Sequence, residues 1–243
     1  MTSDTVASVE LRVDDLVATL WHAAGGLDPA APIVLIGHGG GQHQAHPAVT
    51  GRARMCVAAG LNAAALDLPG HGSRPTSAAD SEFVAELQRR MKAAESVADL
   101  VASHNSLLAG QAVPEWSALL DRLQRNECAN VERVGFWGLS LGGALGLSLA
   151  AHEPRIAAAA VGLCGGDRLL ELAGHVSATV QFVMQWDDEQ VARADALALF
   201  DAIGSQHKTL HANPGRHLDV PIFEREAAVT FLARALASSE DDS

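Results

Sequence analysis

The sequence predicts an α/β fold: a mostly parallel, eight-stranded sheet that begins with an antiparallel hairpin and carries helices on both faces. Short apolar segments alternate with helical segments along most of the 243 residues, the pattern of consecutive strand–helix–strand units. One of them, 32–36, is apolar throughout, as expected for a parallel strand buried on both faces. Polar and glycine-rich segments follow several predicted strands, and ligands bind beyond the carboxyl ends of such strands.

The first half of the chain contains the hairpin and the first parallel strands. Apolar and polar residues alternate loosely on both sides of Asp14-Asp15, which predicts two antiparallel strands. The next two strands end in glycine-rich turns, and a helix connects them. The strands are predicted at 6–13, 16–22, 32–36 and 62–66, the helix at about 47–59, and the turns at 37–41 and 67–72.

The segment 78–130 is long for one crossover. Helical periodicity predicts two helices, at about 79–108 and 114–125, and Pro114 suits the first turn of the second. The extra length would reach over the sheet edge and form part of a cap. We therefore expect changes in this segment to alter substrate range more than the intrinsic reactivity of the site.

The second half continues the alternation without a linker or an internal repeat, so we expect one domain over 1–243. The tail 238–243 is polar and acidic and is expected to be disordered. Strands are predicted at 131–137, 155–163, 179–185 and 208–211, and helices at 141–151, 191–203 and 222–236.

Composition excludes several classes of function. With 17 basic and 29 acidic side chains the net charge is −12, which argues against nucleic acid and anionic lipid as partners. No signal peptide and no stretch of bilayer length is evident, so we expect an unexported protein. Three widely spaced cysteines fit reduced thiols in the cytoplasm better than disulfides or a zinc site.

The most informative motif is Gly138-Leu139-Ser140-Leu141-Gly142, between a predicted strand and a predicted helix. A serine between two glycines at such a break is typical of a nucleophile elbow, which exposes the hydroxyl at the sheet edge. The glycines are needed because side chains there would collide with neighbouring backbone. A serine nucleophile also needs a base and an orienting carboxylate.

The base and the acid are expected in loops that follow later strands. His217 follows the last predicted strand, in a turn that would bring the imidazole over Ser140. The acid is Asp187 or Asp188, since two adjacent carboxylates point in different directions and only one can reach the base.

Together these motifs resemble those of α/β-hydrolases, in the order serine, acid, histidine. The chain is most similar to the dienelactone-hydrolase-like, carboxylesterase-type branch. True dienelactone hydrolases carry cysteine at the elbow, so the serine argues against a dienelactone substrate. The matching segments are His38-Gly39-Gly40, Pro69-Gly70-His71-Gly72, the elbow, Asp188–Val191 and Gly215-Arg216-His217.

The resemblance implies a role for each matching residue. Ser140 would be the nucleophile and His217 the base, and the family's Asp-x-x-Val turn favours Asp188 as the acid, with Asp187 as the alternative. The oxyanion hole would be the backbone N–H groups of Leu141 and Gly40. A phosphate-binding loop is the alternative for the glycine-rich turn, but no Gly-Lys-Ser/Thr follows.

Other side chains near the predicted strand ends are candidates for the substrate pocket. They are His38, Arg74, Cys164 and Trp186. A metal site is the alternative use of the histidines, but no nearby Cys or Glu completes a ligand set. The histidines considered are His38, His43, His46 and His71.

These residues predict a serine hydrolase that cleaves carboxylic esters of small or medium acyl groups without a cofactor or metal. A thioesterase, lactonase or acyltransferase could use the same triad. A binding protein that retains the fold without catalysis is the competing class. The expected partner is a small ester-like molecule; the sequence does not indicate the oligomeric state.

Overall fold

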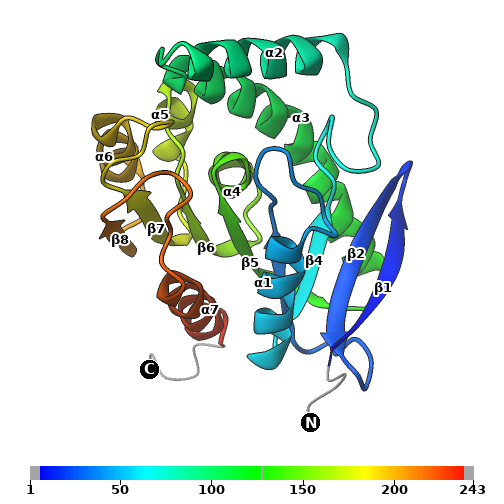
Figure 1. Cartoon of the computed structure of the whole chain (residues 1–243). Helices are drawn as coiled ribbons and strands as arrows, with labels where there is room; N and C mark the ends of the chain where they lie inside the picture. The colour runs from blue at the N-terminus through cyan, green and yellow to red at the C-terminus, as the bar shows by residue number, and fades with distance from the viewer. Residues whose placement is uncertain (1–5, 127, 238–243) are drawn as a thin grey trace.

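The computed structural model describes residues 6–126 and 128–237, which build one eight-stranded sheet (Figure 1). The strand order is β1-β2-β4-β3-β5-β6-β7-β8, with β2 antiparallel to both neighbours and all other pairs parallel. The predicted fold class is thereby confirmed, while the tail 238–243 lies outside the described residues. The strands are β1 (Val6–Val13), β2 (Leu16–Ala23), β3 (Pro32–Ile36), β4 (Asn62–Leu66), β5 (Asn130–Leu139), β6 (Ile156–Gly162), β7 (Thr179–Gln185) and β8 (Lys208–Asn213).

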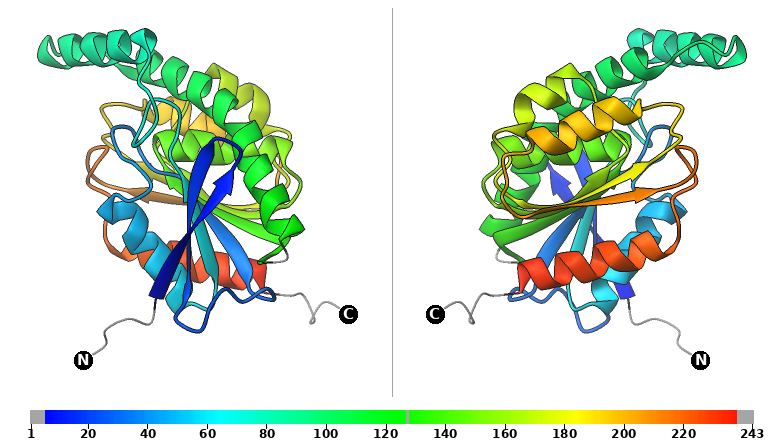
Figure 2. Two further views of the ribbon diagram at one scale, coloured as in Figure 1. Left: turned by 90° about the vertical axis from the view of Figure 1, so that its right-hand side faces the viewer. Right: turned by 90° about the vertical axis from the view of Figure 1, so that its left-hand side faces the viewer.

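Helices cover both faces of the sheet. One face is covered by α1 and α7, and the other by α3, α4, α5 and α6, so the sheet separates two helical layers (Figure 2). No helix within 6–126 or 128–237 is long and apolar enough to cross a membrane. The helices are α1 (Pro47–Ala58), α2 (Ala78–Lys92), α3 (Ala98–Arg125), α4 (Leu141–His152), α5 (Asp167–Ala173), α6 (Arg193–Ala202) and α7 (Phe223–Leu236).

Small residues in the central strands let α4 lie close to the sheet. β6 consists mostly of alanine, and all residues of β4 are buried. A Cβ at Gly146 of α4 would lie 2.5 Å from the Phe136 ring of β5. This close packing fixes the start of α4, and with it the elbow, against the carboxyl ends of β5 and β6.

The prediction for 78–130 was right in the number of helices and wrong in where they divide. The first helix ends at Lys92, and Ala94 has a positive φ of 54°. Pro114 lies inside α3, although it cannot donate the helical bond to residue 110. α3 continues through the proline because it buries side chains on both sides of it, against α4 and the sheet.

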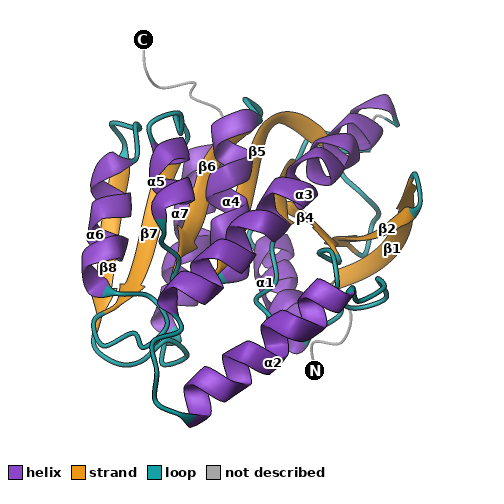
Figure 3. Cartoon of the chain, turned by 90° about the horizontal axis from the view of Figure 1, so that it is seen from above, coloured by secondary structure: helices purple, strands orange, loops and turns teal. Residues whose placement is uncertain are grey.

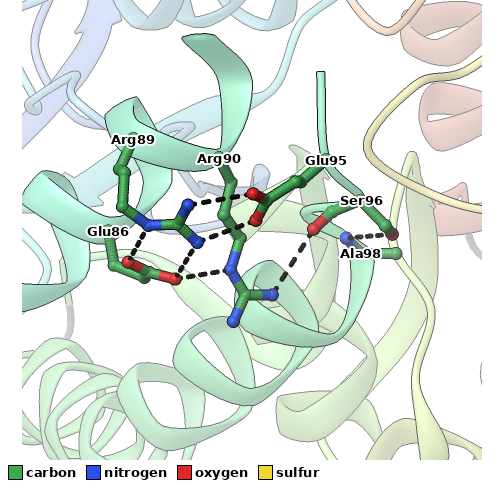
Figure 4. A network of polar contacts seen from close by, with 6 residues as sticks. All are labelled: Glu86, Arg89, Arg90, Glu95, Ser96 and Ala98. Carbon is green, nitrogen blue, oxygen red and sulfur yellow. Dashed lines mark hydrogen bonds and ion pairs between the residues drawn. The ribbon is translucent and has the colours of Figure 1, made fainter. Parts of the chain in front are cut away.

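α2 lies above the other helices, at the carboxyl edge of the sheet (Figures 1 and 3). Its main contact is with α3, and none of its residues is buried. Charged groups hold the corner between the two helices (Figure 4): Arg89 bonds both Glu86 and Glu95, and Arg90 bonds Glu86 and the Ser96 carbonyl. Such exposed ion pairs stabilise only weakly and are screened by salt.

Candidate active site

The elbow holds Ser140 in a strained backbone conformation between β5 and α4. Its φ and ψ are 58° and −120°, a region that non-glycine residues seldom occupy. A Cβ at Gly138 would lie 2.5 Å from the Gly142 oxygen, and one at Gly142 would lie 2.7 Å from the Gly37 oxygen. The Ser140 N–H donates to the Gly162 carbonyl at 3.0 Å. The turn is therefore fixed by close backbone packing, which explains the glycines of the motif.

Three side chains that are far apart in sequence meet at this edge of the sheet. His217 Nε2 lies 2.9 Å from Ser140 Oγ, and His217 Nδ1 lies 2.8 Å from Asp188 Oδ2. The side chains of His217 and Asp188 are both 3% exposed, so the contact between them is sheltered from water. The arrangement is that of a nucleophile, a base and an orienting carboxylate.

The two adjacent aspartates have different surroundings. Asp188 Oδ1 accepts hydrogen bonds from the N–H groups of Gln190 and Val191, at 2.8 and 3.0 Å, which directs the other oxygen toward His217. The Asp187 side chain is 64% exposed and lies 3.5 Å from Arg193. The structure thus brings Asp188, and not Asp187, to the imidazole.

Glu189 is a residue of the site that the sequence analysis missed. Its Oε2 accepts the backbone N–H of His217 at 3.0 Å and lies 3.4 Å from Arg216 Nε. Burial raises the pKa of Glu189, but the His217 N–H and the Arg216 charge outweigh it and keep the pKa below its usual value. Asp188 therefore bonds the side chain of His217, and the next residue, Glu189, bonds its backbone. Only its position beside Asp188 could have indicated this in the sequence.

The glycine-rich turn after β3 is held from below by His38, which is fully buried. Its Nδ1 donates to the Gly39 carbonyl at 2.9 Å, and its Nε2 accepts the Leu68 N–H at 3.0 Å. Burial lowers the pKa of His38 to about 4, so the ring is neutral at pH 7. Both ring nitrogens are thus used to join the turn to the loop after β4.

The residues that carry the two expected oxyanion donors, Leu141 and Gly40, line the same cavity as Ser140. Leu141 is the first residue of α4, where backbone N–H groups have no partner within the helix. A Cβ at Gly40 would meet no atom within 4 Å, so this part of the turn is open. Gly40, Leu141, Ser140 and His217 all line one cavity.

That cavity has a volume of about 740 Å³ and is largely apolar. The two helices of the 78–130 segment form one wall of the cavity. The side chains that line it are Phe83, Val84 and Leu87 of α2 and His104 of α3. The Phe83 ring stacks on His104 with the ring centres 3.6 Å apart. A second cavity of about 890 Å³ is bounded by α3, α5 and α6, and Ser140 does not line it.

The four side chains predicted for the substrate pocket lie outside this cavity. They are His38, Arg74, Cys164 and Trp186. Arg74 forms two 2.7 Å bonds to Glu115, and Trp186 lies on the surface, with the Arg193 guanidinium 4.1 Å from its ring centre. Cys164 lines the second cavity, and burial raises the pKa of its thiol to about 12, which leaves it a poor nucleophile. Strand ends can be predicted from sequence, but the direction of each loop side chain cannot.

The histidines considered as metal ligands lie in two pairs, His38 with His71 and His43 with His46, with ring centres 5.1 and 6.0 Å apart. Within 6–126 and 128–237 there is no group of three or more His, Cys, Asp or Glu side chains that could hold a metal ion. His46 caps α1 by accepting the Ala48 N–H at 3.2 Å, and His71 Nδ1 donates to the Pro69 carbonyl at 2.8 Å. The His46 and His71 rings therefore form hydrogen bonds to the backbone of their own segments.

Fold and site together define an esterase-type hydrolase of the α/β-hydrolase fold. A model of the dienelactone hydrolase family matches residues 60–214, so the chain belongs to the dienelactone hydrolase family. Comparison with curated proteins by sequence gave no match.

Solved structures of esterases resemble the chain over nearly its whole length. A cold-adapted esterase from an Arctic intertidal metagenomic library is 31% identical, with a TM-score of 0.75 and 97% of each chain covered. Acetyl xylan esterase 1 from Thermoanaerobacterium sp. JW/SL YS485 is 16% identical, with a TM-score of 0.70 and 98% of this chain and 89% of that one covered. At that lower identity the likeness concerns the fold alone.

Proposed function

We propose that this enzyme hydrolyses carboxylic esters of small or medium acyl groups through an acyl-enzyme on Ser140. The observation that carries the proposal is the sequence of contacts from Ser140 Oγ to His217 Nε2 and from His217 Nδ1 to Asp188, at 2.9 and 2.8 Å. Hydrogen-bond reach between nucleophile and base, with the base oriented by a third group, is the signature of covalent catalysis.

In acylation, Ser140 Oγ attacks the ester carbonyl carbon while His217 Nε2 takes the hydroxyl proton. Asp188 stabilises the imidazolium, and the N–H groups of Leu141 and Gly40 stabilise the negative charge on the carbonyl oxygen. The imidazolium then returns the proton to the departing alkoxide, which leaves as the alcohol. In deacylation, His217 activates a water molecule in the same way, and the acid is released.

The substrate class is supported by the apolar cavity beside Ser140 and by the esterases among the structural neighbours. We propose that the segment 78–130 is the selective wall of this cavity within a single domain, 1–243. Thioester cleavage, lactone cleavage and acyl transfer would use the same groups. The described cysteines are all free thiols, which supports a cytoplasmic location.

Labelling with a fluorophosphonate tests the proposal. The wild-type protein should be modified at Ser140. The label should disappear in Ser140→Ala and weaken sharply in His217→Ala, whereas His175→Ala, at an exposed histidine, should label normally. Labelling that survives Ser140→Ala would contradict the assigned nucleophile, and a protein that never labels would favour a non-catalytic binding role.

Turnover of nitrophenyl esters of increasing chain length, together with a thioester and a lactone, then defines the substrate class. We expect the nitrophenyl esters of short and medium acids to be the best substrates. A thioester or lactone that is turned over faster would replace the ester assignment without affecting the triad.

A further inference from the structure

The cavity beside the candidate nucleophile and the second cavity adjoin one another, and three residues line both. Val101 and Asn105 lie one turn apart on α3, and Gln190 lies in the loop after β7; we call these three the partition. At the end of β6, Leu163 lines the first cavity and the next residue, Cys164, lines the second. Single side chains therefore separate the two spaces.

Asn105 is a polar residue in a part of α3 that is otherwise mostly apolar where it is buried. It is 8% exposed, yet its side-chain amide forms no hydrogen bond within 6–126 and 128–237 and instead faces the two cavities. Asparagine is also a poorer helix former than leucine or alanine. Because a buried amide without a partner is costly, its position indicates that a ligand supplies the partner.

Gln190 brings a second amide to the partition. Its side chain is half-buried and likewise makes no hydrogen bond in the part of the chain that the structure describes; only its backbone N–H is used, by Asp188 Oδ1 at 2.8 Å. Each side-chain amide has both donors and an acceptor, and a secondary amide in a ligand has the same two kinds of group. Two such side chains at one boundary therefore favour a ligand amide over a group that only accepts.

The charges around the two cavities argue against an anionic ligand at the partition. The first cavity has two acids and two arginines: Asp80, Glu224, Arg52 and Arg225. The second has three acids and one arginine: Asp99, Asp167, Asp195 and Arg168. Carboxylates balance the arginines in the first space and outnumber the arginine in the second, so a neutral ligand group fits this position better than a carboxylate.

We propose that the alcohol part of the ester extends from Ser140 past Asn105 and Gln190 into the second cavity, and that it carries a secondary amide which binds both side chains. The substrates would then be esters of N-acylated amino alcohols. This inference rests on the proposed function, because it assumes that an ester carbonyl is held at Ser140.

The position of the partition selects the alcohol part. The departing alcohol oxygen must lie at His217 Nε2, which returns its proton. Asp188, which bonds His217, accepts the N–H groups of Gln190 and Val191, and both of these residues line the second cavity. The second cavity therefore adjoins the acid–base side of the triad. The apolar wall formed by α2 lines the first cavity alone and remains available to the acyl chain.

The test compares acetate esters whose alcohol parts have the same length with and without an amide. In one pair, 3-acetamidopropyl acetate is compared with hexyl acetate, and the series runs from two to five methylene groups between ester oxygen and amide nitrogen. Release of acetic acid is measured by titration at constant pH. All these esters give the same acetyl-enzyme, so differences in kcat/KM report the alcohol part alone.

The wild type should prefer the amide ester over its hydrocarbon partner at one spacing. Asn105→Leu should lower that preference by about 3- to 10-fold, the value of a hydrogen bond between neutral groups. Gln190→Leu should lower it by less, because Gln190 is more exposed. Gln88→Leu is the matched control: it removes an exposed amide of α2 that lines neither cavity, and the preference should be kept.

The stability of the free protein gives a second measurement. Asn105→Leu should raise the melting temperature, because leucine is the better helix former and leaves no amide without a partner. A lower melting temperature would show that the amide has a structural role and would overturn the argument. An unchanged preference in Asn105→Leu at every spacing would mean that water alone occupies the partition. Loss of a preference for amides in the acyl part instead would overturn the assignment to the alcohol.

Binding separates this inference from the proposed function. At least one of the amide esters should raise the melting temperature of Ser140→Ala, and the shift should be lost when Asn105→Leu is added and kept when Gln88→Leu is added. A shift that persists without the Asn105 amide overturns the subsite even if esters are hydrolysed at Ser140. Failure of Ser140 to label, with a shift that depends on Asn105, would instead contradict the proposed mechanism alone.

Discussion

The elbow and helix α2 both line one cavity but differ in how they are held in the fold. Every residue of α4 from Leu141 to Ala150 is buried, and the turn before it is held by backbone contacts. α2 has no buried residue and is anchored at its end by the exposed Glu86–Arg89–Glu95 contacts. The proposed catalytic groups therefore lie on a tightly packed support, while α2, which forms one wall of the cavity beside Ser140, is weakly attached.

This difference predicts how each region responds to substitution. Changes at the elbow and its supports should alter the chemistry or the stability of the whole protein, because they disturb packing that cannot relax. Changes in α2 should alter the choice of substrate and leave the chemistry and the fold largely unaffected.

The largest expected effect is at Asp188, the proposed acid of the triad. Asp188→Asn should lower kcat by about 10³- to 10⁴-fold, because the amide no longer stabilises the imidazolium or holds its tautomer. Asp187→Asn, at the exposed neighbour, should lower it by less than about threefold. Steady-state kinetics on one nitrophenyl ester measures both. Equal losses, or a larger loss in Asp187→Asn, would mean that the acid is wrongly assigned.

Two glycines within helices, Gly142 of α4 and Gly110 of α3, test by stability how tightly the elbow is packed. Gly142→Ala in α4 should destabilise the protein by about 3 kcal/mol, because the new Cβ would lie 2.7 Å from the Gly37 oxygen and 2.9 Å from the His38 oxygen. Gly110→Ala in α3 meets no atom within 4 Å and should stabilise by about 0.5–1 kcal/mol through helix propensity. Urea unfolding of both variants measures this, and two changes of the same sign would contradict the packing difference.

His38 should make the support of the site sensitive to acid. Because burial lowers its pKa to about 4, the unfolded chain binds a proton below the ordinary value of 6.5 and the folded protein does not. Its contribution to stability is therefore complete above pH 6.5 and is lost as the pH falls toward 4, by about 3 kcal/mol in total.

Urea unfolding across that pH range, compared with His38→Gln, isolates this contribution. The variant starts less stable because it loses the hydrogen bonds of the imidazole, but its unfolding free energy should fall less steeply with acid. Parallel curves for the two proteins would show that His38 is not the group that titrates.

Features that depend on short stretches of sequence could be predicted from the sequence alone. The strands 32–36, 62–66 and 179–185 were predicted with the bounds that the structure has, because continuous apolar runs and glycine turns are local signals. The elbow, His217 and the pair Asp187-Asp188 were found as candidates for the same reason. Their roles stay proposals.

What could not be predicted depends on contacts between distant segments. The break at Ala94 depends on charged groups across a corner, and α3 continues through Pro114 because of its burial against α4. Arg52 and Glu189 face the site because of the paths of α1 and the loop after β7. Arg52 lies in no motif, and Glu189 occupies an unspecified position of the Asp-x-x-Val turn, so no sequence pattern marks either residue.

The smallest expected effect concerns the wall itself, at two apolar side chains one helical turn apart in α2. Leu87 lines the cavity, whereas Met91 is 58% exposed and does not line it. Leu87→Ala should lower kcat/KM for a nitrophenyl octanoate by about tenfold and change the acetate little, because only the longer chain buries its methylene groups against α2. Met91→Ala should leave both unchanged. An equal loss on acetate and octanoate in Leu87→Ala would mean that α2 supports the triad rather than selecting the substrate, and the division between support and wall would then be wrong.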